Sequence, residues 1–413
     1  METHLADFIR DTTAGREAEE ILRKCVHCGF CTATCPTYQL FGDELDGPRG
    51  RIYLIKQVLE GTPPTEKTRL HLDRCLTCRA CESTCPSGVH YSRLLDIGRA
   101  VVEERVQRHG VDAMAREVLR ELLPRPAIFG PAMKLGQLMR PLMPAFLKAK
   151  VTPNQSAGKR PTTRRPRTMV LLEGCAQPSM LPNINAATAR VLDRLGITLQ
   201  VAKKAACCGA VRLHLNDAEG ARDDARRNID AWWPLLHGGA EAIVITASGC
   251  GVQVKDYGHL LQDDPAYADK AAAVAAAAKD VSEVVAAEAG PLARLLAPRK
   301  GTSVRLAFHS PCTLQHGLKI RGVVESLLTA AGFELSTVAD SHLCCGSAGT
   351  YSVLQPAISG RLKENKLAAL SAGQPAAIAS ANVGCIAHLM ADATVPVRHW
   401  IELIDEKLQH QGK

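Results

Sequence analysis

Two cysteine motifs decide the architecture of the N-terminal part of the chain. The first reads Cys25-Val-His-Cys28-Gly-Phe-Cys31-Thr-Ala-Thr-Cys35-Pro36, and the second reads Cys75-Leu-Thr-Cys78-Arg-Ala-Cys81-Glu-Ser-Thr-Cys85-Pro86. Both follow the pattern C-x2-C-x2-C-x3-C-P, which is typical of ferredoxins with two iron–sulfur clusters. The three closely spaced thiolates bind one cluster, and the cysteine before the proline binds the other. The pair of motifs therefore predicts two [4Fe-4S] clusters.

The crossed pattern also predicts which cysteines share a cluster. The expected first set is Cys25, Cys28, Cys31 and Cys85, and the expected second set is Cys75, Cys78, Cys81 and Cys35. The alternative is a pair of structural zinc sites. Zinc usually takes two C-x2-C pairs separated by a longer loop and needs only four ligands, so two complete runs of four cysteines favour clusters.

Length and composition exclude several classes of protein. The chain has 413 residues, 16 cysteines, 46% apolar residues and a formal net charge of +8. This length indicates two or three domains with ordinary cores and excludes a mainly disordered chain or a small disulfide scaffold. We find no secretory signal in residues 1–20 and no run of eighteen apolar residues. We therefore expect reduced, metal-bound thiolates in a cytoplasmic protein.

Helices are expected around both motifs. The pattern predicts helices over residues 17–24, 49–60 and 94–108, an arrangement similar to the helical ferredoxin of respiratory iron–sulfur subunits. Arg49 and Arg51 begin the second helix, where they pair with a partner subunit, pair with an anionic cluster, or simply face solvent. His27 lies inside the first motif, and we expect it to tune the cluster surroundings or face solvent, since all four cysteines of that motif are present.

The C-terminal half is an internal repeat. The first copy contains Met169-Val-Leu-Leu-Glu-Gly-Cys175, Cys207-Cys208-Gly209 and Ile243-Val-Ile-Thr-Ala-Ser-Gly-Cys250. The second contains Val304-Arg-Leu-Ala-Phe-His-Ser-Pro-Cys312, Cys344-Cys345-Gly346 and Ala377-Ile-Ala-Ser-Ala-Asn-Val-Gly-Cys385. Each copy alternates short apolar strands with helices, which predicts a parallel sheet with the cysteines just beyond the strand ends. The alanine-rich stretch 271–289 is expected to form one helix.

Four interpretations remain open for the eight repeat cysteines: a further iron–sulfur cluster, a redox dithiol, a zinc site, or buried structural thiols. The sequence favours a cluster, because adjacent cysteines are rarely chosen for packing and the following glycine lets the backbone approach a bound group closely. His309, His342 and His388 lie within three residues of these cysteines and are candidates to complete a site. The eight residues are Cys175, Cys207, Cys208, Cys250, Cys312, Cys344, Cys345 and Cys385.

The positive charge of the chain is concentrated between the two cysteine-rich parts. No acidic residue lies between Glu121 and Glu173, a stretch that holds ten lysines and arginines. It also carries apolar residues at helical spacing, namely Leu135, Leu138, Met139, Leu142, Met143 and Phe146, although Pro141 and Pro144 interrupt a long helix. This segment is either a contact for a membrane surface or partner, or a plain tether with a core-facing stripe. The folded parts are near neutral, so no nucleic-acid partner is expected.

The two ferredoxin-type motifs followed by two Cys-Cys-Gly repeats resemble a known family over the whole chain. That family includes the iron–sulfur subunit of bacterial glycolate oxidase, the corresponding iron–sulfur subunit of anaerobic glycerol-3-phosphate dehydrogenase, and fused heterodisulfide reductase subunits. Residues 25–61 are most similar to the glycolate oxidase subunit. This resemblance implies a complex with an FAD-binding catalytic subunit and a second flavin-related subunit, which oxidises glycolate and often D-lactate and passes electrons toward membrane quinone.

One departure from the heterodisulfide reductase pattern matters. There, each repeat ends in C-x2-C, whereas here Cys250 is followed by Gly-Val-Gln and Cys385 by Ile-Ala-His. Each repeat therefore lacks the fifth thiolate used for an unusual two-part cluster. Heterodisulfide cleavage is not expected, and one ordinary cluster or none is expected in this domain.

These observations together predict an α+β multidomain protein. The expected parts are a helical 2[4Fe-4S] ferredoxin-like domain (1–121), a basic amphipathic linker (122–167), and two α/β Cys-Cys-Gly repeats (168–300 and 301–413). The chain has neither a G-x-G-x-x-G dinucleotide loop nor a nucleophile elbow, so its expected role is electron transfer rather than catalysis. FAD is expected only on the partner subunits.

Other functions stay open at this point. They are the iron–sulfur subunit of a glycerol-3-phosphate or lactate dehydrogenase, a thiol–disulfide reductase acting at the Cys-Cys-Gly turns, and a zinc-stabilised scaffold. The expected location is the cytoplasm, and the basic apolar segment leaves room for a peripheral place on the inner face of the cytoplasmic membrane.

Overall fold

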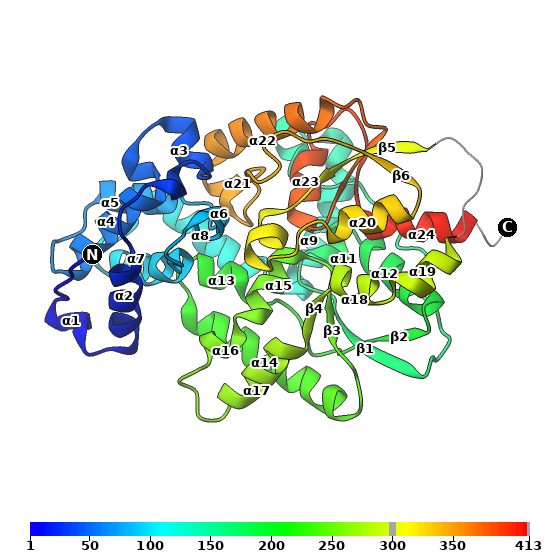
Figure 1. Ribbon diagram of the computed structural model, residues 1–413, viewed down its shortest axis with the longest axis horizontal. Coiled ribbons are helices and arrows are strands. Elements are labelled where there is room, and N and C mark those ends of the chain that lie inside the picture. Colours follow the sequence, from blue (N-terminus) through cyan, green and yellow to red (C-terminus); the bar gives the residue numbers. More distant parts are fainter. Residues whose placement is uncertain (297–302, 411–413) are drawn as a thin grey trace. The chain divides into compact units, whose positions relative to one another are not determined.

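The computed structural model describes residues 1–296 and 303–410 (Figure 1). The chain divides into two compact units. The first unit contains Met1–Glu117, His214–Asn216 and His342–Lys366, and the second unit contains the remaining described residues. The expected domain boundaries after residues 121 and 167 stay predictions, and the expected boundary between residues 300 and 301 lies outside the described residues.

The first unit is helical. The predicted helices around the cysteine motifs are present as α2, α4 and α7, with their ends shifted by up to four residues. The elements of this unit are α1 (Asp7–Arg10), α2 (Thr13–Lys24), η1 (Phe30–Thr32), α3 (Pro36–Phe41), η2 (Glu44–Asp46), α4 (Pro48–Leu59), α5 (Glu66–Asp73), α6 (Ala80–Thr84), α7 (Tyr91–Arg105) and α21 (Tyr351–Leu354), and α8 (Gly110–Leu122) begins in it.

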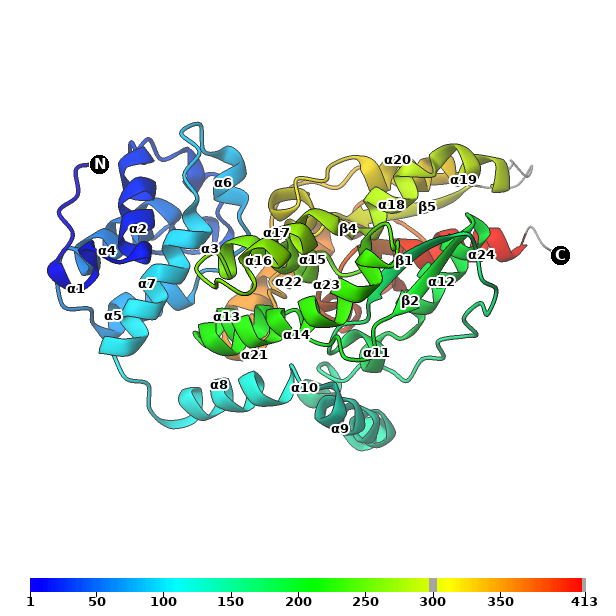
Figure 2. The ribbon, with the colours of Figure 1, turned by 90° about the horizontal axis from the view of Figure 1, so that it is seen from below.

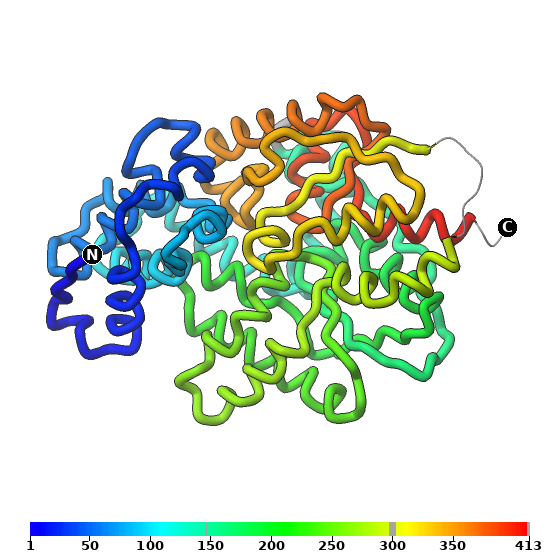
Figure 3. Tube along the Cα trace, viewed as in Figure 1, coloured from blue at the N-terminus to red at the C-terminus, as the bar shows by residue number. Residues whose placement is uncertain are grey.

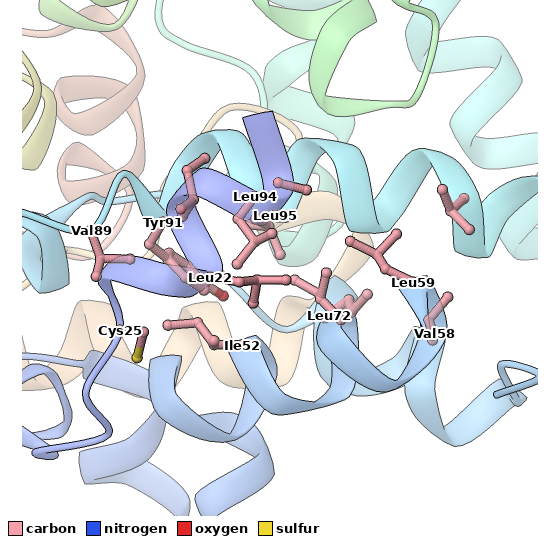
Figure 4. Packing of buried hydrophobic residues seen from close by; sticks show 14 of the residues in the cluster. Leu22, Cys25, Ile52, Val58, Leu59, Leu72, Val89, Tyr91, Leu94 and Leu95 are labelled. Atoms are coloured by element: carbon pink, nitrogen blue, oxygen red, sulfur yellow. The ribbon is translucent and has the colours of Figure 1, made fainter. Parts of the chain in front are cut away.

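The core of the first unit lies between α2, α4 and α7. Leu22, Leu59 and Leu94 are fully buried there and meet in one apolar cluster (Figure 4). Gly98 on α7 lets this helix approach α4 closely, because a Cβ at this position would lie 2.6 Å from the Ile55 side chain. The same cluster includes Cys25, so the core that joins the helices also fixes the start of the first cysteine motif.

The described residues of the second unit contain two parallel four-stranded sheets, as the repeat predicted; Figure 3 traces the path of the chain through them, from cyan and green to yellow and red. The first has the order β2-β1-β3-β4 and the second the matching order β6-β5-β7-β8. Their strands are β1 (Arg167–Leu172), β2 (Ile197–Val201), β3 (Ile243–Ile245), β4 (Ala278–Asp280), β5 (Val304–His309), β6 (Phe333–Ser336), β7 (Ala377–Ser380) and β8 (Val397–His399). Each central strand, β1 or β5, comes first in its repeat, so the following strands add on either side of it.

Helices connect these strands and continue from the cysteine-bearing turns. The helical elements outside the first unit, or only partly in it, are α9 (Pro126–Met139), η3 (Arg140–Leu142), α10 (Ala145–Lys148), α11 (Gln177–Met180), α12 (Asn183–Arg194), α13 (Ala210–His214), α14 (Ala218–His237), α15 (Ser248–Lys255), α16 (Tyr257–Leu260), α17 (Ala268–Ala277), α18 (Val281–Ala287), α19 (Ala289–Leu295), η4 (Thr313–Gly317), α20 (Val323–Ala330), α22 (Pro356–Ser371), α23 (Val383–Met390) and α24 (Trp400–His410).

The expectation of one helix over residues 271–289 is wrong. The structure has α17, then strand β4, then α18. Ala278 and Asp280 pair with β3, and the Asp280 side chain caps α18 by accepting from the Ser282 backbone N–H at 2.9 Å. A buried sheet edge and an N-cap therefore outweigh the high helix propensity of alanine. The equivalent fourth strand of the second repeat, β8, was not predicted either.

Buried polar contacts join the two repeats within the second unit. Arg190 on α12 forms an ion pair with Asp405 on α24 at 2.7 Å. His399 is fully buried at the end of β8, and its Nε2 lies 3.0 Å from the Thr246 carbonyl oxygen of the first repeat. Because a carbonyl only accepts, Nε2 carries the proton and Nδ1 accepts from the Ile401 N–H at 3.2 Å. This geometry requires a neutral imidazole.

In the part of the chain that the structure describes, no helix combines the length and the apolar character needed to cross a membrane.

The His399 contact makes the stability of the second unit depend on pH. Burial lowers the pKa of His399 to about 3, against an ordinary value of 6.5. Below that ordinary value the unfolded chain binds a proton that the folded chain does not, so the free energy of unfolding falls with pH by up to about 1.4 kcal/mol per unit. Between about pH 7.5 and pH 5 the expected loss from this one group is about 2 kcal/mol.

The replacement His399→Gln should make the pH dependence flatter by that amount, while lowering stability at neutral pH. Chemical denaturation at both pH values measures the difference, and His4→Gln, at an exposed position, is the matched control. An unchanged pH slope in the His399 variant would show that the buried imidazole is not the titrating group.

Candidate metal centres

Five cysteines line one hollow in the first unit, with about 440 Å³ of empty space. They are Cys25, Cys28 and Cys31 of the first motif and Cys81 and Cys85 of the second. Cys25 follows directly after α2, and its backbone N–H donates to the Leu22 carbonyl oxygen at the end of that helix. Cys28 is exposed, so this hollow opens to the surface at one of these cysteines.

A second hollow of about 380 Å³ is lined by Cys75, Cys78 and Cys81 of the second motif and by Cys35 of the first. Cys81 borders both hollows, so the two lie side by side in the first unit. Apart from Cys81, which lines both hollows, each set is the one expected from the crossed pattern of the motifs. Counting Cys81 with the rest of its own motif, the structure places the eight N-terminal cysteines as two groups of four around adjoining hollows.

The loops of the two motifs have the same backbone conformation. His27 and Gly29 have positive φ angles of 55° and 86°, and Thr77 and Arg79 have 51° and 59°. These are the second and fourth residues after the first cysteine of each motif. Left-handed residues at alternate positions turn the backbone around the hollow, so the three cysteines between and beside them face it. Non-glycine residues adopt this conformation only where the surroundings hold them there.

The chemistry of each group of four thiols fits an iron–sulfur cluster. Burial raises the pKa of Cys31 to about 11, and the neighbouring thiols of Cys25 and Cys85 contribute to this rise. Burial also raises the pKa values of Cys25 and Cys81 above their ordinary value. Four thiolates at one buried place repel one another unless a cation compensates their charge, and iron provides that charge in clusters held by four cysteines.

A fully buried arginine, Arg51, lines the second hollow. Arg51 is 1% exposed and donates two hydrogen bonds of 3.1 Å to the Thr37 hydroxyl and one of 2.7 Å to the His71 carbonyl oxygen. The same hydroxyl lies 3.3 Å from the Cys35 sulfur. The alternative in which Arg51 faces solvent is therefore wrong. The Thr37 hydroxyl contacts both the Arg51 guanidinium and the Cys35 sulfur of the second group.

A buried carboxylate balances part of the positive charge near this hollow. Asp46 is buried and lies 3.4 Å from Arg51, 2.7 Å from Arg74 and 3.0 Å from His71. A further buried arginine, Arg99, donates to the Cys75 carbonyl oxygen at 2.9 Å. Three arginines, Arg51, Arg74 and Arg99, therefore lie near the second group of thiols, and Asp46 pairs with two of them.

The surroundings of the first hollow are more exposed. Arg49 is half-buried and pairs with Glu44 at 2.7 Å, and one of its nitrogens would lie 2.8 Å from a Cβ at Gly29. The His27 ring is half-buried, meets Tyr53 edge-on, and has its pKa lowered by burial and then by Arg49. His27 therefore belongs to the surroundings of the first hollow rather than to open solvent.

The first repeat gathers its four cysteines within the second unit. Hydrogen bonds between thiols join Cys175 to Cys207, Cys207 to Cys208, and Cys208 to Cys250. The thiols of Cys175 and Cys208 lower the pKa of Cys207 in this way, while their own pKa values rise. Four thiols gathered within one repeat are a donor set suited to a metal centre.

Two buried side chains hold this cysteine turn in place. Asn228 on α14 donates from Nδ2 to the Cys207 carbonyl oxygen at 2.7 Å. Tyr257 donates from its hydroxyl to the Cys208 carbonyl oxygen at 3.0 Å and accepts from Asn228 at the same distance. Both backbone carbonyls are thus satisfied by helices of the same repeat, which leaves the thiols to face one another.

The glycine after each cysteine pair makes room for a helix. Gly209 has φ of 89°, and a Cβ there would lie 3.0 Å from the Ala221 carbonyl oxygen of α14. Gly346 has φ of 87°, and a Cβ would lie 2.6 Å from the Ser359 carbonyl oxygen of α22. In both repeats the close approach is to the protein backbone, so these contacts explain the glycine without a bound group.

The cysteines of the second repeat are divided between the two units. Cys312 and Cys385 lie in the second unit, where Asn382 donates to the Cys385 sulfur at 3.3 Å and a ring nitrogen of His309 lies within 4.8 Å of it. His388 follows on the same helix as Cys385 and is half-buried.

The Cys344–Cys345 turn belongs to the first unit, together with the preceding His342. After this turn, Tyr351 donates from its hydroxyl to the Arg74 carbonyl oxygen at 2.9 Å, next to Cys75. The expected gathering of all eight repeat cysteines at one edge stays a prediction.

Two protein families match the parts of the chain that carry these groups. Residues 21–89, which contain the first eight cysteines, match the 4Fe-4S dicluster domain family. Residues 169–255 and 306–390, which contain the other eight, match the Cysteine-rich domain family once in each repeat. The dicluster match agrees with two groups of four thiols in the first unit.

Relatives match the chain as a whole. It is 54% identical to the glycolate oxidase iron-sulfur subunit of Escherichia coli (strain K12) over 412 residues, which covers 100% of both chains. It is 31% identical to the probable glycolate oxidase iron-sulfur subunit of Bacillus subtilis (strain 168), covering 90% of this chain and 89% of that one. Lactate utilization protein A of Bacillus velezensis is 26% identical, covering 56% of this chain and 97% of that one. The chain belongs to the family of glycolate oxidase iron–sulfur subunits.

Proposed function

We propose that this chain is the electron-transfer subunit of an oxidase complex that acts on glycolate and D-lactate. The single observation that carries the proposal is the crossed arrangement of eight cysteines as two adjoining groups of four. Two adjoining redox centres give a short path along which electrons pass singly. The name of the E. coli relative supports glycolate as the substrate. We assign the substrate pocket to a partner subunit.

We assign one cluster to Cys25, Cys28, Cys31 and Cys85, and the other to Cys75, Cys78, Cys81 and Cys35. A [4Fe-4S] cluster accepts and releases one electron at a time, whereas a reduced flavin holds two. The cysteines hold and orient the iron, the surrounding helices exclude water, and Arg51 places a buried positive charge where an added electron would otherwise be costly.

The proposed partners are an FAD-binding catalytic subunit and a second flavin-related subunit, with quinone or another membrane acceptor beyond them. The E. coli relative is itself named as one subunit of an oxidase, which supports a complex. The proposed place is the cytoplasm, at the inner face of the cytoplasmic membrane where a quinone acceptor is within reach. The alternative function, as the iron–sulfur subunit of a glycerol-3-phosphate or lactate dehydrogenase, would involve the same electron-transfer role.

The four thiols of the first repeat are proposed to hold a third iron–sulfur cluster. Support comes from the hydrogen bonds that join Cys175, Cys207, Cys208 and Cys250 into one group. A thiol–disulfide reductase is less well supported, because Cys207 is fully buried and Cys208 is 3% exposed, so a protein disulfide has no access to them.

The relay is tested by Cys78→Ser in the assembled complex. This change removes one of the four thiolates assigned to the second cluster, so quinone reduction by glycolate should fall to background while flavin reduction by glycolate persists. Stopped-flow absorption separates the two reactions. Ser83→Ala, at an exposed residue on α6, is the matched control and should keep both. Quinone reduction at the normal rate in the Cys78 variant would contradict electron transfer through the second cluster.

The third cluster is tested by metal analysis of the anaerobically purified chain. Three clusters require about twelve irons per chain, and two require about eight. The double replacement Cys207→Ser/Cys208→Ser should lower iron from about twelve to about eight and leave the two dicluster signals in low-temperature EPR. Cys250→Ser provides a second variant at a less buried thiol. About eight irons in the unaltered chain would contradict a third cluster, and one zinc lost in both variants would assign zinc.

The role of Arg51 is tested through reduction potentials. Removing a buried positive charge destabilises the reduced state, so Arg51→Gln should lower the midpoint potential of one cluster, on the order of 60 mV, a tenfold change in the ratio of reduced to oxidised forms. EPR-monitored redox titration measures this shift. Arg51→Lys keeps the charge and should restore most of the potential, whereas Arg49→Gln, near the more exposed hollow, should cause a smaller shift. Equal potentials in all variants would contradict the electrostatic role.

A further inference from the structure

Helix α9 and the turn after it bury few of their large apolar side chains. The buried residues of α9 are Gly130 and Met133, and two polar residues of the segment, Gln137 and Arg140, are partly buried. Gln137 donates from Nε2 to the Ser179 carbonyl oxygen at 3.0 Å, and Arg140 donates from Nε to the Val151 carbonyl oxygen at 2.9 Å. Gln137 thus joins α9 to α11, and Arg140 joins the turn after α9 to the chain that follows it.

The outer side of the same segment is apolar and exposed. Leu135, Leu138 and Leu142 are 63%, 76% and 80% exposed, and they follow one another at spacings of three and four residues. Ile128, Met139 and Leu147 are exposed as well. An amphipathic helix normally turns this stripe to the core, so a stripe of large side chains turned outward marks a contact surface. We call residues 128–150 of this outer side the α9–α10 surface; α9, α10 and the adjoining α11 are labelled in Figure 2.

The charge of this surface indicates what it contacts. Lys134, Lys148 and Lys150 are exposed in or beside the apolar stripe. No acidic residue lies between Glu121 and Glu173, so the sequence of this stretch carries positive charge alone. Lysine is depleted in the centre of protein–protein interfaces, whereas at a lipid surface its chain lies along the apolar region and its ammonium group reaches the headgroups.

We propose that the α9–α10 surface docks on an anionic lipid bilayer. The helix lies in the interface with its leucines among the acyl chains and its lysines at the phosphate groups. Pro141 and Pro144 end α9 early and break the segment into short pieces, which suits a shallow position. This proposal deepens the peripheral membrane location proposed above by naming the surface and the chemistry that provide it.

Vesicle co-sedimentation of the full, cluster-loaded chain tests the proposal. The chain should sediment with vesicles of phosphatidylcholine and phosphatidylglycerol and much less with phosphatidylcholine alone, and added salt should release it. Leu138→Glu/Leu142→Glu should weaken binding at least tenfold. Lys134→Gln/Lys148→Gln should weaken binding and reduce its salt dependence. Both pairs are exposed, and unchanged cluster absorption and circular dichroism show that each variant is folded.

The matched control is Leu70→Glu/Val201→Glu, which changes two exposed apolar residues on other elements and should bind like the unaltered chain. The proposal is overturned if the unaltered chain does not bind anionic vesicles, or if the control loses binding as strongly as the Leu138/Leu142 variant. It is also overturned if the leucine variant binds vesicles normally but no longer assembles with the flavin subunit, because the surface would then be a protein interface.

Electron transfer to a water-soluble acceptor separates this proposal from the proposed function. The leucine variant should reduce such an acceptor at the normal rate within the complex, because its clusters are untouched. If the unaltered complex does not reduce the water-soluble acceptor, the result counts against the proposed electron-transfer function and not against the lipid contact.

Discussion

Neither N-terminal cysteine motif completes its own group of thiols. The last cysteine of each motif lines the hollow of the other motif, so the two groups form only when both loops are in place. The rest of the first unit follows from this constraint. Helices α4 and α5 lie between the motifs in the sequence, and α4 packs on α7, with Leu59 and Leu94 in the same apolar cluster as Cys25 and Cys81. The core and the candidate metal centres are therefore one cooperative structure.

Much of this arrangement could be predicted from the sequence, because the spacing of cysteines depends on the geometry of the cluster that they bind. The four sulfurs of each group, the duplicated strands and the parallel sheets all follow from local patterns. The surroundings of the sulfurs could not be predicted in the same way. Asp46, Thr37 and Arg51 meet across the fold beside Cys35, and no spacing rule connects a buried aspartate to an arginine that it faces only after folding. Tyr257 and Asn228 are similar cases in the first repeat.

The reason for the glycine after each cysteine pair could be found only in the structure. The glycine after each cysteine pair suggested room for a bound group. Instead, Gly209 and Gly346 each sit against a backbone carbonyl of the helix that follows. Both copies of the repeat therefore keep the same backbone conformation at this glycine and the same close packing of the turn on the following helix. The side chains around the thiols then diverged: Asn228 and Tyr257 satisfy the turn in the first copy, whereas His309 and Asn382 approach Cys385 in the second.

The first unit is assembled from separate stretches of chain, and this has a consequence for how the protein can be divided. Residues 1–117 carry all eight cysteines of the dicluster, but the unit also includes His342–Lys366, whose Tyr351 hydroxyl satisfies the Arg74 carbonyl beside Cys75. A truncated gene that ends after Glu117 would encode every sulfur and still leave that carbonyl without its donor. The dicluster unit therefore does not end at residue 117, and its last segment leaves the ribosome about 225 residues after its first part is complete.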